Sequence, residues 1–448
     1  MVVNKSKYPP VFLLYVDSSG FGAAEVFLKA GIKVVGFTIA TRFSYESLSL
    51  KRYRLVHLRG DDKSRVLTII KEAERFKGVK PVLIVNGETV LDLVLDNYSL
   101  LKNYLNFEIP KQEIIKFFRE KDCFNALAHE YNIKIPLSFE VDKEFWQQKI
   151  ASLSVKYPLV IKPKYRDDNW IKIFKYQKVI VVNSYDELFY YCNMLLSFID
   201  KIVVQEWIPG TDEDLYFCLA YITKEGEILD SFCGKKVRQY PVLFGTLGSA
   251  LPFYDRYIEK EALRILRLKG NYGFCSVEFK KCCVTGEYYV IEPTAGRLDR
   301  QEHLAYLNGC NILLNAYSYM SGVDLELYKK RRGLKFLKSK KPFMFIEESK
   351  EVRSCIELYS YGKFSVKEYY SLLRENKPAF MYMGYSEPFL SLAVILATVK
   401  KIIQFMFNSK LRNQYRTGII NHLLDLNCEN SSSIVTSKAN IKANIDAD

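Results

Sequence analysis

Residues 273–297 form the stretch that most constrains the fold, because two β-prone runs flank a short turn there. The run GFCSVEFKKCCVTGEYYVIEPTAGR is rich in aromatic and β-branched residues and predicts an antiparallel hairpin closed at Thr285-Gly286. Side chains alternate between the faces of a strand. We therefore expect one face to carry Ser276, Glu278 and Lys280, and the facing strand to present Tyr288, Val290 and Glu292 together.

This pattern places two carboxylates, Glu278 and Glu292, on the same side of the predicted hairpin. Carboxylates buried without partners cost several kcal/mol or take up protons. A divalent cation would compensate them, and Mg²⁺ prefers one or two carboxylates together with phosphate oxygens. A solvated strand face with two ordinary glutamates is the alternative, and the hairpin alone does not decide between the two.

Composition and charge describe a globular protein with an anionic partner. The chain has 448 residues, of which 49% are hydrophobic and 26% charged, enough for two or three packed domains. Lys and Arg number 65 against 51 Asp and Glu, a net charge of +14. This excess indicates a nucleotide, nucleic acid, anionic glycan or membrane surface as partner, without choosing among them.

Cysteine and histidine usage argues against several kinds of site. The ten cysteines include no CxxC pair, and only four histidines are present. The segment Met1–Lys7 is polar, so we expect no signal peptide, free thiols and a cytoplasmic location. Histidine-based metal or nucleophile sites are disfavoured.

The first 112 residues predict a small α/β domain with a Rossmann-like sheet. Residues 10–38 read strand–loop–helix–strand, and further strands are expected at 52–58 and 81–85. The loop Ser19-Gly20-Phe21-Gly22 lacks the third glycine of a dinucleotide-binding loop, since Glu25 stands there. A tight strand-to-helix turn is the preferred interpretation.

The C-terminal part has a different character, and we expect a basic, mainly helical extension over 323–428. Residues 329–341 contain eight basic residues in thirteen and no acidic ones. The apolar run 389–407 has helical spacing, but Lys400 and Lys401 make it a poor membrane-spanning helix. It could pack in the core or lie on a membrane surface. Residues 429–448 are polar and predicted to be disordered.

Several segments together resemble the ATP-grasp superfamily, in particular its carboxylate–amine ligase-like branch. The resemblance runs from about Pro10 to about Val323, and the order and spacing of the segments carry it. The segments are PPVFLLYVDSSGFGAAEVFLKAGIKVVG, EKDCFNALAHEYNIKIP, PLVIKP, VVQEWIPGTDEDLYF, GKKVRQYP with FGT, GFCSVEF and YYVIEPTAGRLDRQEHLA. It implies a pre-ATP-grasp α/β domain at 1–112 and an ATP-grasp domain at 113–322. That domain would have a small nucleotide-covering subdomain at about 136–206 and a large subdomain at about 207–322.

The resemblance also implies roles for particular residues. Lys121, Lys162 and Lys178 would line the nucleotide site, Gln205, Glu206, Trp207 and Ile208 would form the adenine-binding linker, and Asp214 would accept the ribose hydroxyls. Glu278 and Glu292 would bind Mg²⁺. Arg238 and Arg297 would hold the acyl phosphate or the activated carboxylate, because the planar guanidinium binds two oxygens at once. Lys236 lies two positions before Arg238, so we expect both on one face of a strand.

Two departures from the family pattern bear on the cofactors, ATP and Mg²⁺. Thr294 stands where many relatives have an asparagine that binds metal, so one Mg²⁺ site is expected and a second is not supported. The loop after Lys162, PKYRDDNW, is not the glycine-rich flap that commonly covers phosphates.

The resemblance implies an ATP-dependent ligase that joins a small amino acid or other amine to a carboxylate through an acyl phosphate. A cell-envelope precursor such as a peptidoglycan stem peptide or a surface-glycan uronic acid is one hypothesis for the acceptor. An anionic or lipid-linked acceptor, with peripheral membrane contact through 389–407, would suit the basic C-terminal part. A non-catalytic nucleotide- or anion-binding protein is the alternative. Nucleic acid ranks low, because the basic run has only Phe336 as an aromatic residue. A homodimer is compatible with the sequence.

Overall fold

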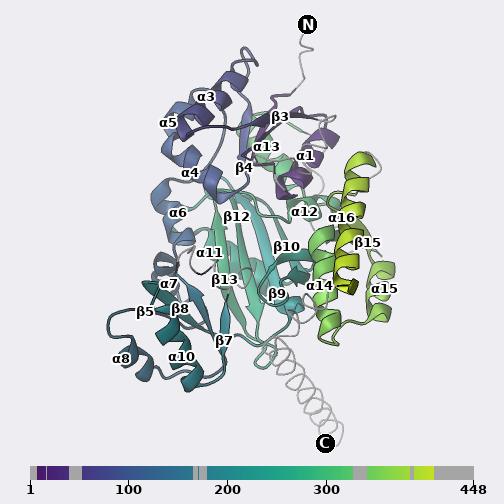
Figure 1. The fold of residues 1–448 in the computed structure, drawn as a ribbon. Coiled ribbons are helices and arrows are strands. Elements are labelled where there is room, and N and C mark those ends of the chain that lie inside the picture. The colour runs from purple at the N-terminus through teal and green to yellow at the C-terminus, as the bar shows by residue number, and fades with distance from the viewer. Residues whose placement is uncertain are drawn as a thin grey trace, which may run out of the picture.

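A computed structural model describes residues 8–16, 18–39, 53–164, 170, 179–325, 341–383 and 388–407. Three β-sheets organise these residues, and helices cover their faces (Figure 1). The α/β fold expected from the sequence is confirmed. The basic run at 329–340, Lys178 and the tail 429–448 lie outside the described residues.

The N-terminal sheet is parallel and has the strand order β3-β2-β1-β4. Its elements are β1 (Val11–Leu14), α1 (Ser18–Lys29), β2 (Val34–Thr38), β3 (Arg54–His57), α3 (Asp62–Ala73), β4 (Val82–Val85), α4 (Glu88–Asp96) and α5 (Tyr98–Lys102). Strands β1, β2 and β4 are buried along their whole length, as expected when helices cover both faces of a parallel sheet. The expected loop at residues 19–22 is instead the first turn of α1.

A second, antiparallel sheet has the order β5-β8-β6-β7 and lies at the lower left in Figure 1. Two helices lead into it, and two pack on it. These elements are α6 (Gln112–Arg119), α7 (Lys121–Glu130), β5 (Ser138–Asp142), α8 (Trp146–Ala151), β6 (Leu159–Pro163), β7 (Ile180–Val182), α10 (Tyr185–Leu195) and β8 (Lys201–Glu206). Strand β8 ends at Glu206. Of the expected adenine linker, Gln205 and Glu206 therefore lie on the strand, and Trp207 and Ile208 follow it.

The large central sheet has seven strands in the order β13-β12-β9-β10-β11-β14-β15. Its first part comprises η1 (Asp212–Asp214), β9 (Leu215–Ile222), β10 (Ile228–Tyr240), β11 (Thr246–Pro252), α11 (Arg256–Leu266), η2 (Leu268–Gly270), β12 (Gly273–Lys281) and β13 (Tyr288–Ala295). The hairpin predicted at 273–297 is therefore β12 and β13, at one edge of this sheet. Two helices follow the hairpin, α12 (Glu302–Leu307) and α13 (Ile312–Ser321).

Residues after 341 complete the large sheet as well as adding helices. Strand β14 (Phe343–Ile346) pairs with β11, and β15 (Lys377–Phe380) pairs with β14. The remaining elements are α14 (Glu348–Ser360), α15 (Val366–Glu375) and α16 (Pro388–Phe407), which stand together at the right of Figure 1. The sequence did not predict the two strands, because the four-residue apolar run of β14 does not distinguish a strand from a buried helix segment, and the residues KPAF of β15 show no strand pattern. The C-terminal region is thus part of the central sheet.

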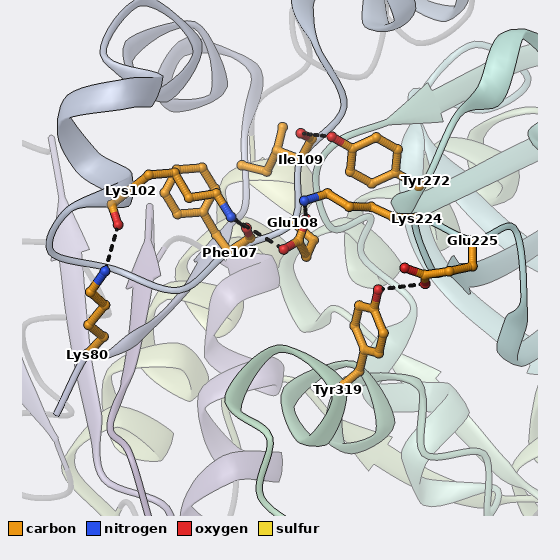
Figure 2. Close-up of polar contacts among 9 residues, drawn as sticks. All are labelled: Lys80, Lys102, Phe107, Glu108, Ile109, Lys224, Glu225, Tyr272 and Tyr319. Atoms are coloured by element: carbon orange, nitrogen blue, oxygen red, sulfur yellow. Dashed lines mark hydrogen bonds and ion pairs between the residues drawn. The ribbon is translucent and has the colours of Figure 1, made fainter.

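A polar cluster joins the N-terminal α/β part to the large sheet (Figure 2). Glu108 accepts ion pairs from two lysines, from Lys102 Nζ at 3.3 Å and from Lys224 Nζ at 2.6 Å. Nearby, the Tyr272 hydroxyl donates to the Ile109 carbonyl at 2.9 Å. Burial lowers the pKa of Lys102, with Glu108 opposing that shift. Glu108 therefore holds two cations from different parts of the fold.

We expect Glu108→Gln to lower the free energy of unfolding by about 1–2 kcal/mol, because Lys102 would be left half-buried without its counter-charge. The measurement is reversible urea unfolding monitored by circular dichroism. Glu225→Gln is the matched control: exposed Glu225 accepts from the Tyr319 hydroxyl at 2.9 Å, and the amide oxygen can accept the same bond. Equal effects of the two substitutions would contradict the assignment.

Candidate active site

A cavity of about 1000 Å³ lies where the three sheets approach one another. Its wall includes the ends of β1 and β4 in the N-terminal sheet, helices α6 and α7, strands β6 and β8 of the small sheet, and the β12–β13 hairpin of the large sheet. Seven of the predicted site residues line it: Lys121, Lys162, Gln205, Lys236, Glu278, Glu292 and Arg297.

The two hairpin glutamates face each other because of a β-bulge. Glu278 is directly opposite Glu292, whereas the next pair is Phe279 opposite Val290. Ile291 is therefore an extra residue on β13, and such a residue re-aims the side chains after it. Residues opposite each other share a face, so Val290 lies on the face of Phe279 and Glu292 on the face of Glu278, although both Val290 and Glu292 line the cavity. The expected pairing of the glutamates is observed, but the expectation that Val290 and Glu292 share a face is wrong.

The electrostatic surroundings of this pair suit a bound cation. Glu292 meets the solvent of the cavity but is surrounded by protein, and this desolvation raises its pKa, with Glu278 and Asp299 adding to the effect. Lys236 is buried and donates to Glu278 at 2.8 Å. A divalent cation between Glu278 and Glu292 would remove their repulsion, so the donor set fits Mg²⁺.

Within the described parts of the chain, no group of three or more His, Cys, Asp or Glu side chains is arranged to hold a metal ion. Mg²⁺ held by Glu278 and Glu292 could take its remaining ligands from the phosphates of a bound ligand and from water. This matches the ordinary way in which Mg²⁺ binds with phosphorylated substrates.

Lysines from two other elements enter the cavity opposite the glutamates. Lys162 lies on β6 and donates to the side-chain oxygen of Gln205 on β8 at 2.6 Å. Burial, together with the charge of neighbouring Lys121, lowers the pKa of Lys162 to about 8, whereas Glu292 opposes the shift. Burial also lowers the pKa of Lys121, again against attraction by Glu292. The cavity thus holds two closely spaced cations beside an acidic centre.

The loop after β13 adds charged groups to the same wall. Arg297 lies 3.4 Å from Glu88, which follows β4 in the N-terminal sheet. Asp299 accepts from the Ser276 hydroxyl at 2.8 Å, and its backbone N–H donates to Glu302 at 2.6 Å. Arg300 also lines the cavity. This loop therefore supplies two arginines and a fixed carboxylate at the end of the cavity nearest the N-terminal sheet.

Arg238 lies outside the cavity wall, which corrects the expectation that it faces the substrate beside Lys236. The register of β10 against β11 shifts on both sides of Arg238, so the simple alternation of faces fails there. Its guanidinium lies 3.0 Å from buried Glu351 on α14 and over the ring of Tyr369 on α15, 4.8 Å from the ring centroid. The role of Arg238 in this structure is to join β10 to the C-terminal helices.

The other predicted nucleotide residues lie near the cavity but not in its wall. Glu206 accepts from the backbone N–H of Leu137 at 3.1 Å, and the Trp207 ring packs on Phe244 at 5.3 Å. Ile208 is buried. Asp214 accepts from the backbone N–H of Thr211 at 2.7 Å, and so caps η1. Lys178 lies outside the described residues, so its prediction stays open.

Sequence reasoning did not single out the contribution of the N-terminal sheet. Tyr15, Asn86, Gly87 and Glu88 all line the cavity, immediately after β1 and β4. A usable signal was present, because ligands bind outside the carboxyl ends of parallel strands and Asn86-Gly87 follows such a strand. Leu243, Phe244, Gly245 and Thr246 also line the cavity and were not among the predicted site residues.

Comparison with known proteins identifies the fold of this chain. No protein-family model matches the chain. An N5-carboxyaminoimidazole synthetase from Staphylococcus aureus, solved with ADP, superposes with a TM-score of 0.52 at 14% identity, over 72% of this chain and 80% of that one. An L-amino acid ligase from Bacillus licheniformis superposes with a TM-score of 0.50 at 16% identity, over 72% and 77%. The chain has the ATP-grasp fold, and the resemblance inferred from its sequence is confirmed.

Sequence comparison finds one curated enzyme that is similar to this chain. The D-aspartate ligase of Enterococcus faecium (strain Aus0004) is 22% identical over 329 residues, which cover 69% of this chain and 76% of the relative. The sequence and structural comparisons thus both lead to ligases and synthetases that have the ATP-grasp fold.

We expect direct labelling to show the lowered pKa of Lys162. At pH 8 about half of its side chains would be neutral and reactive toward an amine-selective reagent, because only the unprotonated amine reacts. The measurement is the labelling rate of Lys162 against pH by mass spectrometry, with exposed lysines of the same chain as references. Lys121→Met removes a neighbouring positive charge and should move the midpoint for Lys162 upward. A midpoint near 10.5, unchanged by Lys121→Met, would contradict this account.

Proposed function

We propose that the protein is an ATP-dependent carboxylate–amine ligase that forms an amide bond through an acyl phosphate. The observation that carries this proposal is the pairing of Glu278 with Glu292 inside a cavity that Lys121 and Lys162 also line. The likeness to D-aspartate ligase and to L-amino acid ligase supports it.

In the proposed reaction, a substrate carboxylate oxygen attacks the γ-phosphorus of ATP, and the bond to ADP breaks. An amine then attacks the acyl carbon, loses a proton, and expels inorganic phosphate. Lys121 and Lys162 would bind the phosphates. Glu278 and Glu292 would hold Mg²⁺, which neutralises charge on the transferred group.

The substrate carboxylate needs cations at the other end of the cavity. Arg297 and Arg300 line it there, and Lys236 lines it beside Glu278; arginine binds carboxylates through two parallel hydrogen bonds. Arg238 is not assigned to this role, because it pairs with Glu351. We propose a small amino acid as the amine and a cell-envelope precursor, such as a stem peptide or a uronic acid, as the carboxylate.

Glu292→Gln should abolish amine-dependent ADP formation, with a loss of at least about a hundredfold, because a neutral amide binds Mg²⁺ more weakly than a carboxylate. The assay screens D- and L-amino acids against stem-peptide and uronic-acid acceptors. Glu213→Gln is the control, since Glu213 pairs with Lys235 away from the cavity. Mg-ADP binding without turnover for any substrate pair would indicate a nucleotide-binding protein instead.

We also propose that helix α16 places the protein on the inner face of an anionic membrane. Its outer face is apolar and exposed along its length, with exposed fractions of 61% for Leu396 and 81% for Phe407. The same face includes Leu392, Ile395, Val399, Ile402 and Ile403. No helix in the described parts of the chain has the length and apolar character needed to span a bilayer.

Charge favours a membrane surface over a second protein copy as the occupant of this face. The helix carries Lys400 and Lys401 without an acidic residue, and Lys410, Arg412 and Arg416 follow in the sequence. An apolar helix face bordered by basic residues is typical of helices that lie in the interface of anionic bilayers. A single helix face is also narrower than the roughly 20–30 residues that a standard protein interface uses per partner.

The full chain should therefore float with vesicles containing phosphatidylglycerol and not with vesicles of phosphatidylcholine alone. Leu396→Asp with Phe407→Asp should abolish flotation, since both side chains are exposed and their removal spares the core. Tyr370→Asp is the matched control on α15, where Tyr370 is 68% exposed. Absence of flotation by the unaltered chain, or a dimer that the α16 substitutions dissociate, would refute the membrane assignment.

A further inference from the structure

The loop between β10 and β11 forms part of the cavity wall, and its backbone is strained. Leu243, Phe244, Gly245 and Thr246 all line the cavity. Leu243 has a left-handed backbone with φ of 69°, which is unfavourable for a residue with a side chain. A Cβ atom at Gly245 would lie 2.0 Å from the carbonyl carbon of Tyr240, so only glycine fits there. Such a loop depends on contacts from outside itself.

Two buried carboxylates from distant parts of the chain supply those contacts. Asp212 accepts from the backbone N–H groups of Gln239 at 3.0 Å and Leu243 at 2.9 Å. Glu357 accepts from the backbone N–H of Val242 at 2.9 Å and from the Tyr361 hydroxyl at 3.3 Å. Asp212 precedes β9, whereas Glu357 lies on α14 in the C-terminal region.

Apolar packing at the same place connects the loop to the small sheet. Val242 and Leu243 cluster with Tyr361, which directly follows α14, and with Val160 and Val181 of the small sheet. Leu358 of α14 packs against the same cluster, so the helix contacts the loop region through both a carboxylate and an apolar side chain. The cluster links the C-terminal region, the cavity loop and strand β6, which carries Lys162.

We infer that Glu357 is a positioning residue, through which helix α14 fixes the cavity loop 240–246 in the conformation that lines the site. Removing its carboxylate would leave the Val242 N–H buried without an acceptor and free the loop to change shape. The effect on loop order does not depend on the proposed ligase activity. Only the expected effect on Mg-ADP binding rests on that proposed function.

Hydrogen–deuterium exchange of the full chain tests the inference directly. In the unaltered protein, the amides of Val242 and Leu243 should exchange as slowly as those of the β10 strand, although they lie in a loop. Glu357→Leu should increase exchange at Val242 by roughly tenfold or more, because the amide loses its acceptor. Glu357→Gln keeps an oxygen that can accept this bond and should restore slow exchange.

Glu348→Leu is the matched control on the same helix. Glu348 is as deeply buried as Glu357, with 3% exposure for each, and accepts from the backbone N–H groups of Tyr382 at 2.9 Å and Met383 at 2.7 Å. It should raise exchange at residues 382–383 and leave the loop protected. Equal exchange of the loop in both leucine variants, or rapid exchange of Val242 in the unaltered protein, would overturn the inference.

The affinity for Mg-ADP separates this role from general instability. In Glu357→Leu, the affinity for Mg-ADP should fall severalfold, while Glu348→Leu and Glu357→Gln should remain close to the unaltered protein. Unchanged Mg-ADP affinity in a Glu357→Leu protein with a disordered loop would show that the loop does not shape the nucleotide site, which would also overturn the inference. Loss of turnover with intact loop protection would instead concern the ligase proposal alone.

Discussion

The repulsion between Glu278 and Glu292 is the constraint around which the cavity is arranged. Like charges directly opposite each other on antiparallel strands destabilise a sheet. In the structure, cations surround this pair. Lys236 donates a hydrogen bond to Glu278, and the charge of Glu292 acts to raise the pKa of Lys121 and of Lys162. Burial raises the pKa of Glu292, and the charges of Glu278 and Asp299 raise it further, so a positive charge bound between the carboxylates would oppose this shift. An acidic pair poised in this way suits a divalent cation better than a purely structural role.

Two β-irregularities decide which side chains reach the cavity. The extra residue Ile291 turns Glu292 toward Glu278, and the register shifts around Arg238 turn it toward Glu351. Both lie beside the functional residues, where bulges commonly occur in sheets. A β-irregularity thus brings Glu292 into the site and takes Arg238 out of it. Neither irregularity is visible in the residue pattern of its strand.

The sequence predicted the elements better than the faces of the strands. The hairpin, the parallel N-terminal sheet and the apolar helix at 389–407 follow from residue patterns that depend on local spacing. The position of Arg238 could not be predicted, because a bulge depends on the partner strand and leaves no period in its own sequence. The strands β14 and β15 were missed for a related reason, since only the pairing of β14 with β11 and of β15 with β14 identifies them as strands.

The cavity has no need of a side-chain nucleophile, and its residues agree with that. Cys275 lies on the strand of Glu278, but burial raises the pKa of its thiol, so the reactive thiolate is disfavoured. Catalysis in such a site comes from holding charged substrates in place and stabilising the charge that develops. A site of this kind depends on rigid walls, because small displacements of charged groups weaken it. The carboxylates of Asp212 and Glu357 bind a loop of the wall whose backbone is strained at Leu243, and Glu357 does so from helix α14 in the C-terminal region. This explains physically why residues after 341 are built into the central sheet: they hold the cavity wall as well as extend the fold.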